Sequence, residues 1–133
     1  PVNRLPAAGG PIGALTMYTA DGERDARFGS GGRVLVDGLE TIRALATRAD
    51  GSYVLVGSAL PINRGDYDFL VMGLNADGTR DSGFGDAGIV AVDFYAGIDA
   101  ATAVTIQPDG KLLVAGTIMN GTTREMGLIR VVP

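Results

Sequence analysis

An internal repeat constrains the fold of this chain more than any other feature of its sequence. Residues 19–29 return 56 positions later as residues 75–85, and the longer stretches 15–37 and 71–93 are identical at 11 of 23 positions. The second half of the unit recurs too: an Asp-Gly pair followed by an apolar run returns 59 positions later. A fixed period of this length is typical of propellers and other repeat architectures.

The repeat predicts how the chain is organised. An N-terminal extension (1–14) precedes two units (15–68 and 69–125), and residues 126–133 begin a third unit or complete a neighbouring sheet.

Each unit is expected to form four short strands. In the second unit they are residues 68–74, 89–94, 102–107 and 111–117, which are rich in Val, Ile, Leu and Thr and are bounded by turn residues. The fourth strand is continuously apolar in both units, which is typical of a sheet that is covered on both faces. We therefore expect little helix and tightly stacked sheets.

Glycine and phenylalanine recur at fixed places in the units. Asp-Gly pairs supply the positive φ of tight hairpins, and the two phenylalanines are expected to pack between blades rather than against a ligand. The structural positions are Gly22, Phe28, Gly29, Gly51, Gly57, Gly78, Phe84, Gly85, Gly110 and Gly116.

These features predict an all-β, β-propeller-like fold with two four-stranded antiparallel blades plus the first strand of a third. A β-sandwich is the competing architecture, but it needs no repeat at this period. Propellers close with typically 4–8 blades, so two units leave open faces. The chain is a piece of a longer propeller, or self-associates into a closed ring, or docks in a larger complex.

The second unit resembles a known bacterial repeat. Asn75-Ala76-Asp77-Gly78, the later Phe84-Gly85, and the run Gln107-Pro108-Asp109-Gly110-Lys111 before an apolar strand are similar to the delta-60 repeat family. The first unit departs from that pattern, with Arg48-Ala49 in place of Gln-Pro. The resemblance implies a propeller-like fold in secreted, periplasmic or cell-surface proteins of bacteria, and it implies no catalytic activity.

Calcium is the most chemically reasonable ligand for this sequence. Oxygen-bearing side chains surround a Gly-containing loop in each unit, and Ca²⁺ prefers oxygen ligands. The candidates are Asn75, Asp77 and Asp81, with Asp21 and Asp25 in the first unit. A complete calcium loop has more carboxylates, and Asp before Gly is ordinary turn chemistry. We therefore predict no metal and no cofactor.

Composition excludes several classes of enzyme and partner. The chain has no His and no Cys, so zinc sites with those ligands and Ser-His or Cys-His nucleophiles are excluded within it. Its net charge is −4 and its 11 basic residues are scattered, which predicts no nucleic-acid binding. No apolar run approaches the ~18 residues of a membrane helix, so no membrane insertion is expected.

Three other groups of residues were considered as sites. Arg64, Gly65, Asp66 and Tyr67 form an interaction candidate, because an exposed loop is a suitable place for a recognition tripeptide. Asp66 and Asp68 lie two apart, as an acid–base pair would, but their loop position favours solvated charges. Asp37 and Asp93 end equivalent strands and are interpreted as turn residues.

The sequence thus favours a non-catalytic scaffold that binds other protein chains, as a module of a bacterial envelope or secreted protein or as an accessory subunit of a larger assembly. A binding module for glycans or small ligands between blades is the first alternative; it predicts exposed aromatic side chains, for which Tyr67 and Tyr95 are placed. A fragment of a larger propeller enzyme is the second.

Overall fold

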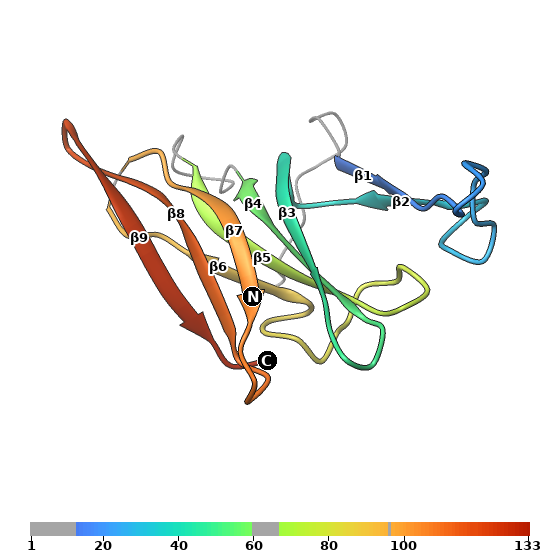
Figure 1. Ribbon diagram of the computed structural model, residues 1–133. Helices are drawn as coiled ribbons and strands as arrows, with labels where there is room; N and C mark the ends of the chain where they lie inside the picture. Colours follow the sequence, from blue (N-terminus) through green and yellow to red (C-terminus); the bar gives the residue numbers. More distant parts are fainter. Residues whose placement is uncertain (1–12, 60–66, 96) are drawn as a thin grey trace.

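The computed structural model describes residues 13–59, 67–95 and 97–133 and is all-β (Figure 1). No helix forms in these ranges, and accordingly none there is long and apolar enough to span a membrane. The strands are β1 (Gly13–Thr16), β2 (Arg33–Val36), β3 (Thr41–Thr47), β4 (Tyr53–Ala59), β5 (Asp68–Leu74), β6 (Ile89–Val92), β7 (Ala100–Ile106), β8 (Leu112–Asn120) and β9 (Thr123–Val131).

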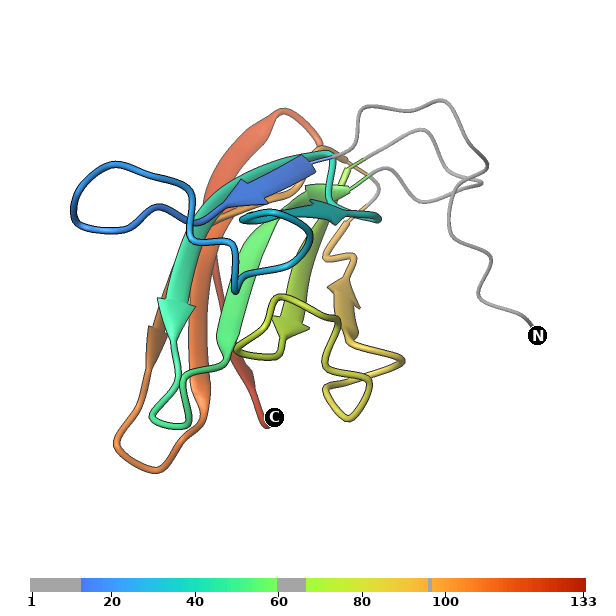
Figure 2. The ribbon, with the colours of Figure 1, turned by 90° about the vertical axis from the view of Figure 1, so that its right-hand side faces the viewer.

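The strands form three antiparallel sheets. The first sheet is β1-β2, the second is β3-β4-β5-β6 and the third is β7-β8-β9. Figure 2 looks from the side of the first sheet and shows the sheets one behind another, as blades of a propeller lie.

The expected number of strands per unit is confirmed, but the division into sheets differs from the expectation. The chain passes from one sheet to the next after the second strand of each unit, and we call these segments crossings. The second sheet therefore joins the last two strands of the first unit to the first two strands of the second unit. These crossings are residues 37–40 and 93–99. A β-bulge follows each one, between Ile42 and Ala44 and between Ala101 and Ala103, and bends the incoming strand.

The repeated sequence gives repeated register. Phe69 pairs with Val92 across β5 and β6, and Gly13 pairs with Val36 at the corresponding place in β1 and β2. In the same way Val56 of β4 pairs with Val71 of β5. Ala115, 59 residues after Val56, pairs with Leu128, 57 residues after Val71. Equivalent residues can therefore be compared directly between sheets.

Two apolar clusters hold the stack together. One lies between the first and second sheets and includes Val36 and Leu39 with Leu55 and Met72, all four almost fully buried. The other lies between the second and third sheets and is built around fully buried Phe69. Burial of apolar side chains between sheets is the main stabilising term at about 25 cal/mol per Å².

Two glycines lie where the strands approach most closely. A Cβ on Gly57 would collide with the carbonyl oxygen of Thr41, and a Cβ on its equivalent Gly116 would collide with that of Ala100. The expected turn glycines have positive φ, between 55° and 88°: Gly22, Gly29, Gly51, Gly78, Gly85 and Gly110. Phe28 and Phe84 are 3% and 1% exposed.

Candidate functional site

The acidic turns are built by side chains that bond their own backbone two residues ahead. Asp50, Asp77 and Asp109 each accept the backbone N–H of residue i+2, and each also bonds that residue's side chain. These hydrogen bonds stabilise the ionised carboxylates and lower their pKa values. The Asp-Gly pairs therefore work as turn formers.

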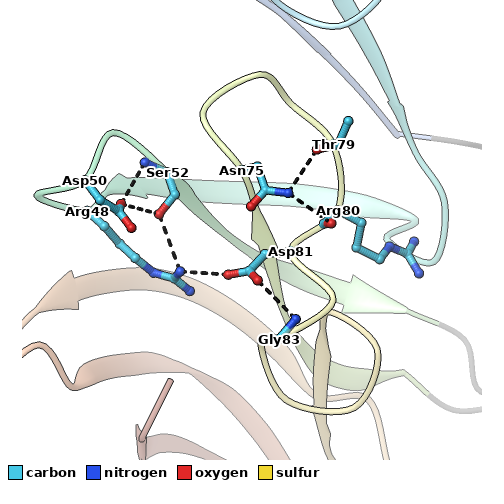
Figure 3. Close-up of polar contacts among 8 residues, drawn as sticks. All are labelled: Arg48, Asp50, Ser52, Asn75, Thr79, Arg80, Asp81 and Gly83. Carbon is cyan, nitrogen blue, oxygen red and sulfur yellow. Dashed lines mark hydrogen bonds and ion pairs between the residues drawn. The ribbon is translucent and has the colours of Figure 1, made fainter.

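A polar network joins two of these turns (Figure 3). The Arg48 Nη1 atom lies 3.0 Å from Asp81 Oδ2 and 3.4 Å from Ser52 Oγ. Asp81 Oδ1 also accepts the Gly83 N–H at 3.1 Å. The Arg48 guanidinium lies over the Phe84 ring, 5.0 Å from its centroid. Arg48 thereby links the β3–β4 turn to the loop between β5 and β6.

Two buried nitrogens of Arg48, Nε and Nη2, make no hydrogen bond within the described part of the chain. The Phe84 ring compensates in part, because an aromatic face attracts a cation at this distance. Its other partners are the Asp81 carboxylate and the Ser52 hydroxyl, which lie in two neighbouring loops. Arg48 therefore has a structural role, holding these loops together.

The calcium candidates of the second unit are engaged in this network or next to it. Asn75 Nδ2 donates to Thr79 Oγ1 at 2.9 Å and to the Arg80 carbonyl at 3.3 Å. Asp77 bonds Thr79, and both oxygens of Asp81 have partners. These side chains face their own loop rather than a common centre.

The first unit arranges its candidates differently. Asp25 forms a two-point ion pair with Arg27, at 2.8 and 2.7 Å, which lowers the pKa of Asp25 to about 2. Asp21 lies exposed in the adjoining turn. Among residues 13–59, 67–95 and 97–133, no group of three or more acidic side chains is placed to hold a metal ion.

Most of the interaction candidate lies outside the described residues: Arg64, Gly65 and Asp66. Tyr67 is described and is half-buried, and its hydroxyl donates to Glu40 Oε1 at 3.1 Å. That hydrogen bond and the nearby carboxylate raise the pKa of Tyr67. Tyr95 is the more open of the two aromatic candidates, at 44% exposed.

A groove of about 600 Å³ lies between the first and second sheets. Its walls include Val34 and Val36 of β2 with Met72 and Leu74 of β5, and the charged residues Asp37 and Arg80 also line it. Arg80 is held in place because its Nη2 donates to the Asp37 carbonyl at 2.6 Å. The groove therefore combines an apolar lining with a few polar groups, as small-ligand sites often do.

Asp99 is a buried group that the sequence reasoning missed. Its side chain is fully buried and accepts the Phe94 N–H at 3.1 Å and the Met119 N–H at 3.0 Å. Its own N–H donates to the Tyr67 carbonyl at 2.7 Å. Asp99 thus fastens the crossing after β6 to β8. Its place in a loop gave no signal, since Asp in loops is ordinary.

The remaining carboxylates considered for catalysis do not converge in the described structure. Asp37 and Asp93 are exposed residues after β2 and β6, at equivalent positions in the two units. Asp68 is 9% exposed and begins β5, whereas Asp66 lies outside the described residues.

The third sheet presents two large apolar side chains on its outer face. Met126 is 82% exposed and Leu128 is 59% exposed, and both lie on β9. They alternate with Gly127 and Val131, which are buried against the second sheet. The β8–β9 turn is tight: Asn120 pairs with Thr123, and Gly121 has a φ of 61°, as the first position of a type II′ turn requires.

Comparison with known proteins gives a fold family and no activity. No curated protein matches the chain in sequence. Residues 48–84 and 107–131 match a family model described as a domain of unknown function (DUF5122) beta-propeller. Each matched segment contains a strand pair of one sheet, β4–β5 or β8–β9, and so spans the boundary between sequence units. The match and the all-β structure together support a β-propeller-like repeat family.

Proposed function

We propose that this chain is a non-catalytic scaffold that binds other protein chains through the open ends of its stack of sheets. The exposed face of β9 carries the proposal. Met126 and Leu128 lie side by side on alternate positions of an edge strand, and exposed apolar patches mark interaction sites. The chemistry of the loops supports the non-catalytic part, because the carboxylates of the acidic turns are taken up by turn hydrogen bonds and the chain has no His or Cys.

A pull-down with a matched pair of baits tests this function. The wild-type chain and a Met126→Glu/Leu128→Glu variant are immobilised at equal density, and proteins retained from the producing cell are quantified by mass spectrometry. We expect at least one protein to be retained by the wild type and lost tenfold or more with the variant. Equal retention of every protein by both baits would contradict the proposal.

We also propose that the repeat is of the bacterial delta-60 type and that the chain acts in the cell envelope or outside the cell. The turn sequence at residues 107–111 and the strand that follows it support this assignment. Protease treatment of intact cells, followed by detection of the chain, tests the location. Full protection until the cells are lysed would contradict a surface or secreted location.

Binding of a small acidic ligand is a second candidate function, and the groove between the first two sheets favours it. Arg80 lines it together with apolar side chains of β2 and β5. Titration calorimetry with an acidic oligosaccharide, such as a short polygalacturonate, tests this function. We expect binding by the wild type and a loss of tenfold or more in Arg80→Ala. No heat with either protein would contradict it.

A further inference from the structure

The outer face of the third sheet repeats, at two positions of β9, a face that is buried elsewhere in the chain. Because the registers agree, Met126 is equivalent to Phe69 and Leu128 is equivalent to Val71. Phe69 and Val71 are both fully buried, in the cluster between the second and third sheets. Their equivalents on β9 are 82% and 59% exposed.

The neighbouring strands extend this correspondence. Ala44, Val54 and Val56 of the second sheet face the third sheet in the same cluster. Their equivalents on β7 and β8 are Ala103, Leu113 and Ala115, which are exposed or half-buried. The outer face of the third sheet therefore carries apolar side chains on all three strands, with Arg124 and Arg130 beside them on β9, and we call it the trailing face.

The first sheet has the opposite open side, which we call the leading face. Ala14 of β1 is equivalent to Leu70, which packs toward the first sheet, and Ala14 is exposed. Leu35 of β2 and Tyr18 after β1 are 58% and 56% exposed. Inside the chain, the trailing face of the first sheet packs on the leading face of the second, and the trailing face of the second sheet packs on the leading face of the third.

The Phe69 ring shows how a trailing face and a leading face fit inside the chain. A Cβ added to Gly116 would lie 2.6 Å from this ring, so a large residue on the trailing face of the second sheet packs on a glycine on the leading face of the third sheet. Met126 is the equivalent large residue on the open trailing face.

We propose that the trailing face of one copy of this chain packs on the leading face of a second copy, head to tail. The inference rests on the proposed scaffold function and names its partner. Such a contact is heterologous, so it repeats into a ring or a filament. It continues the stacking that already exists twice inside the chain.

Single substitutions on each face test the proposal. Met126→Glu blocks the trailing face and Leu35→Glu blocks the leading face, while both side chains are exposed, so folding is preserved. Ile98→Glu is the matched control, since Ile98 is 60% exposed and lies in the loop before β7. Circular dichroism confirms the fold of each variant before use.

Sedimentation velocity at rising concentration, up to about 1 mM, where even weak contacts are populated, gives the readout. We expect the wild type and Ile98→Glu to associate, and each face variant to associate at least tenfold more weakly. An equal mixture of the two face variants is expected to form a one-to-one dimer and nothing larger, because each variant retains one intact face of the pair.

Two outcomes would overturn the proposal. One is a wild-type chain that stays monomeric at the highest concentration. The other is a mixture of face variants that stays monomeric although the wild type associates. If the self-association fails while the pull-down still shows a protein that depends on Met126 and Leu128, the scaffold function stands with another partner. If both fail, the scaffold function falls as well.

Discussion

The equivalent strands β5 and β9, in the second and third sheets, differ in what covers them and in charge, since β9 carries Arg124, Glu125 and Arg130. Every residue of β5 is buried, whereas in β9 only Gly127 and Val131 are. The two strands share their register with the preceding strand and their alternation of side chains. The contrast teaches that a strand's place in the stack contributes to its burial, because Phe69 and Met126 are large apolar residues at equivalent positions and only Phe69 is covered by another sheet.

The largest expected effect comes from truncating the side chain at one equivalent position in the second and third sheets. Phe69→Ala removes a fully buried ring and is expected to lower the free energy of unfolding by about 3–5 kcal/mol. Met126→Ala is expected to change it by less than about 0.5 kcal/mol in the dilute chain. Urea unfolding followed by circular dichroism measures both. Similar losses for the two variants would break the comparison, since they would mean that the outer face is already covered.

The crossings between sheets offer a second comparison. Asp99→Ala leaves the N–H groups of Phe94 and Met119 without their acceptor. Because both hydrogen bonds are only partly buried, the change is expected to cost about 1–2 kcal/mol for each group, or about 2–4 kcal/mol together. Glu40 occupies the corresponding place before β3, and its side chain accepts one hydrogen bond from the Tyr67 hydroxyl within the described residues, so Glu40→Ala is expected to cost about 1 kcal/mol. The same unfolding experiment checks this order, and a larger loss for Glu40→Ala would reverse it.

A smaller effect is expected where the two units differ in one loop. Ala87 has a φ of 51°, and the equivalent residue in the first unit is Gly31, with a φ of 59°. Because the left-handed region costs a residue with a Cβ about 1 kcal/mol, Ala87→Gly is expected to stabilise the chain by about that amount. Gly31→Ala is expected to destabilise it equally, since no atom lies within 4 Å of the added Cβ. Shifts of the same sign in thermal unfolding would contradict this reason.

The smallest effect concerns the acidic loops. The pKa of Asp25 is lowered from 3.8 to about 2, chiefly by its hydrogen bond from the Arg27 side chain. A carboxyl whose pKa is lower in the folded state stabilises the fold fully above pH 3.8, and this contribution is lost as the pH falls toward 2. We expect carboxyl NMR titration to find this low pKa and Arg27→Ala to raise it. An unchanged pKa in Arg27→Ala would exclude the ion pair as the cause.

Much of the fold could be predicted from the sequence because the repeat marks the same strands twice. Residues 68–74 were predicted as a strand and form β5 without a change of boundary. The strand predicted at 111–117 corresponds to β8, which begins at Leu112 and continues to Asn120 because the tight turn lets it pair with β9 along its whole length. Local patterns of β-branched residues and Asp-Gly turns are sufficient for such assignments.

The division into sheets could not be predicted in the same way. A repeat has no intrinsic starting point, so any four consecutive strands fit the period equally well. What decides the sheets is where the chain crosses from one to the next, and this depends on tertiary contacts such as those of Leu39 and Asp99.

The site was predicted in part. The turn role of the Asp-Gly pairs was apparent from local sequence, and Asp50, Asp77 and Asp109 bond their own turns. The contact between Arg48 and Asp81 joins residues 33 positions apart, so it was not apparent. The absence of calcium and of catalysis stays a prediction.

Methionine oxidation tests the central claim most directly, namely that the trailing face is an open copy of a buried one. Peroxide converts exposed methionine to its sulfoxide, and mass spectrometry locates it. We predict that Met126 is oxidised rapidly in dilute solution and is protected at high concentration, whereas Met72, which is 1% exposed, is protected in both. Rapid oxidation of Met126 at every concentration would contradict stacking of copies, and protection of Met126 in the dilute monomer would contradict the open face itself.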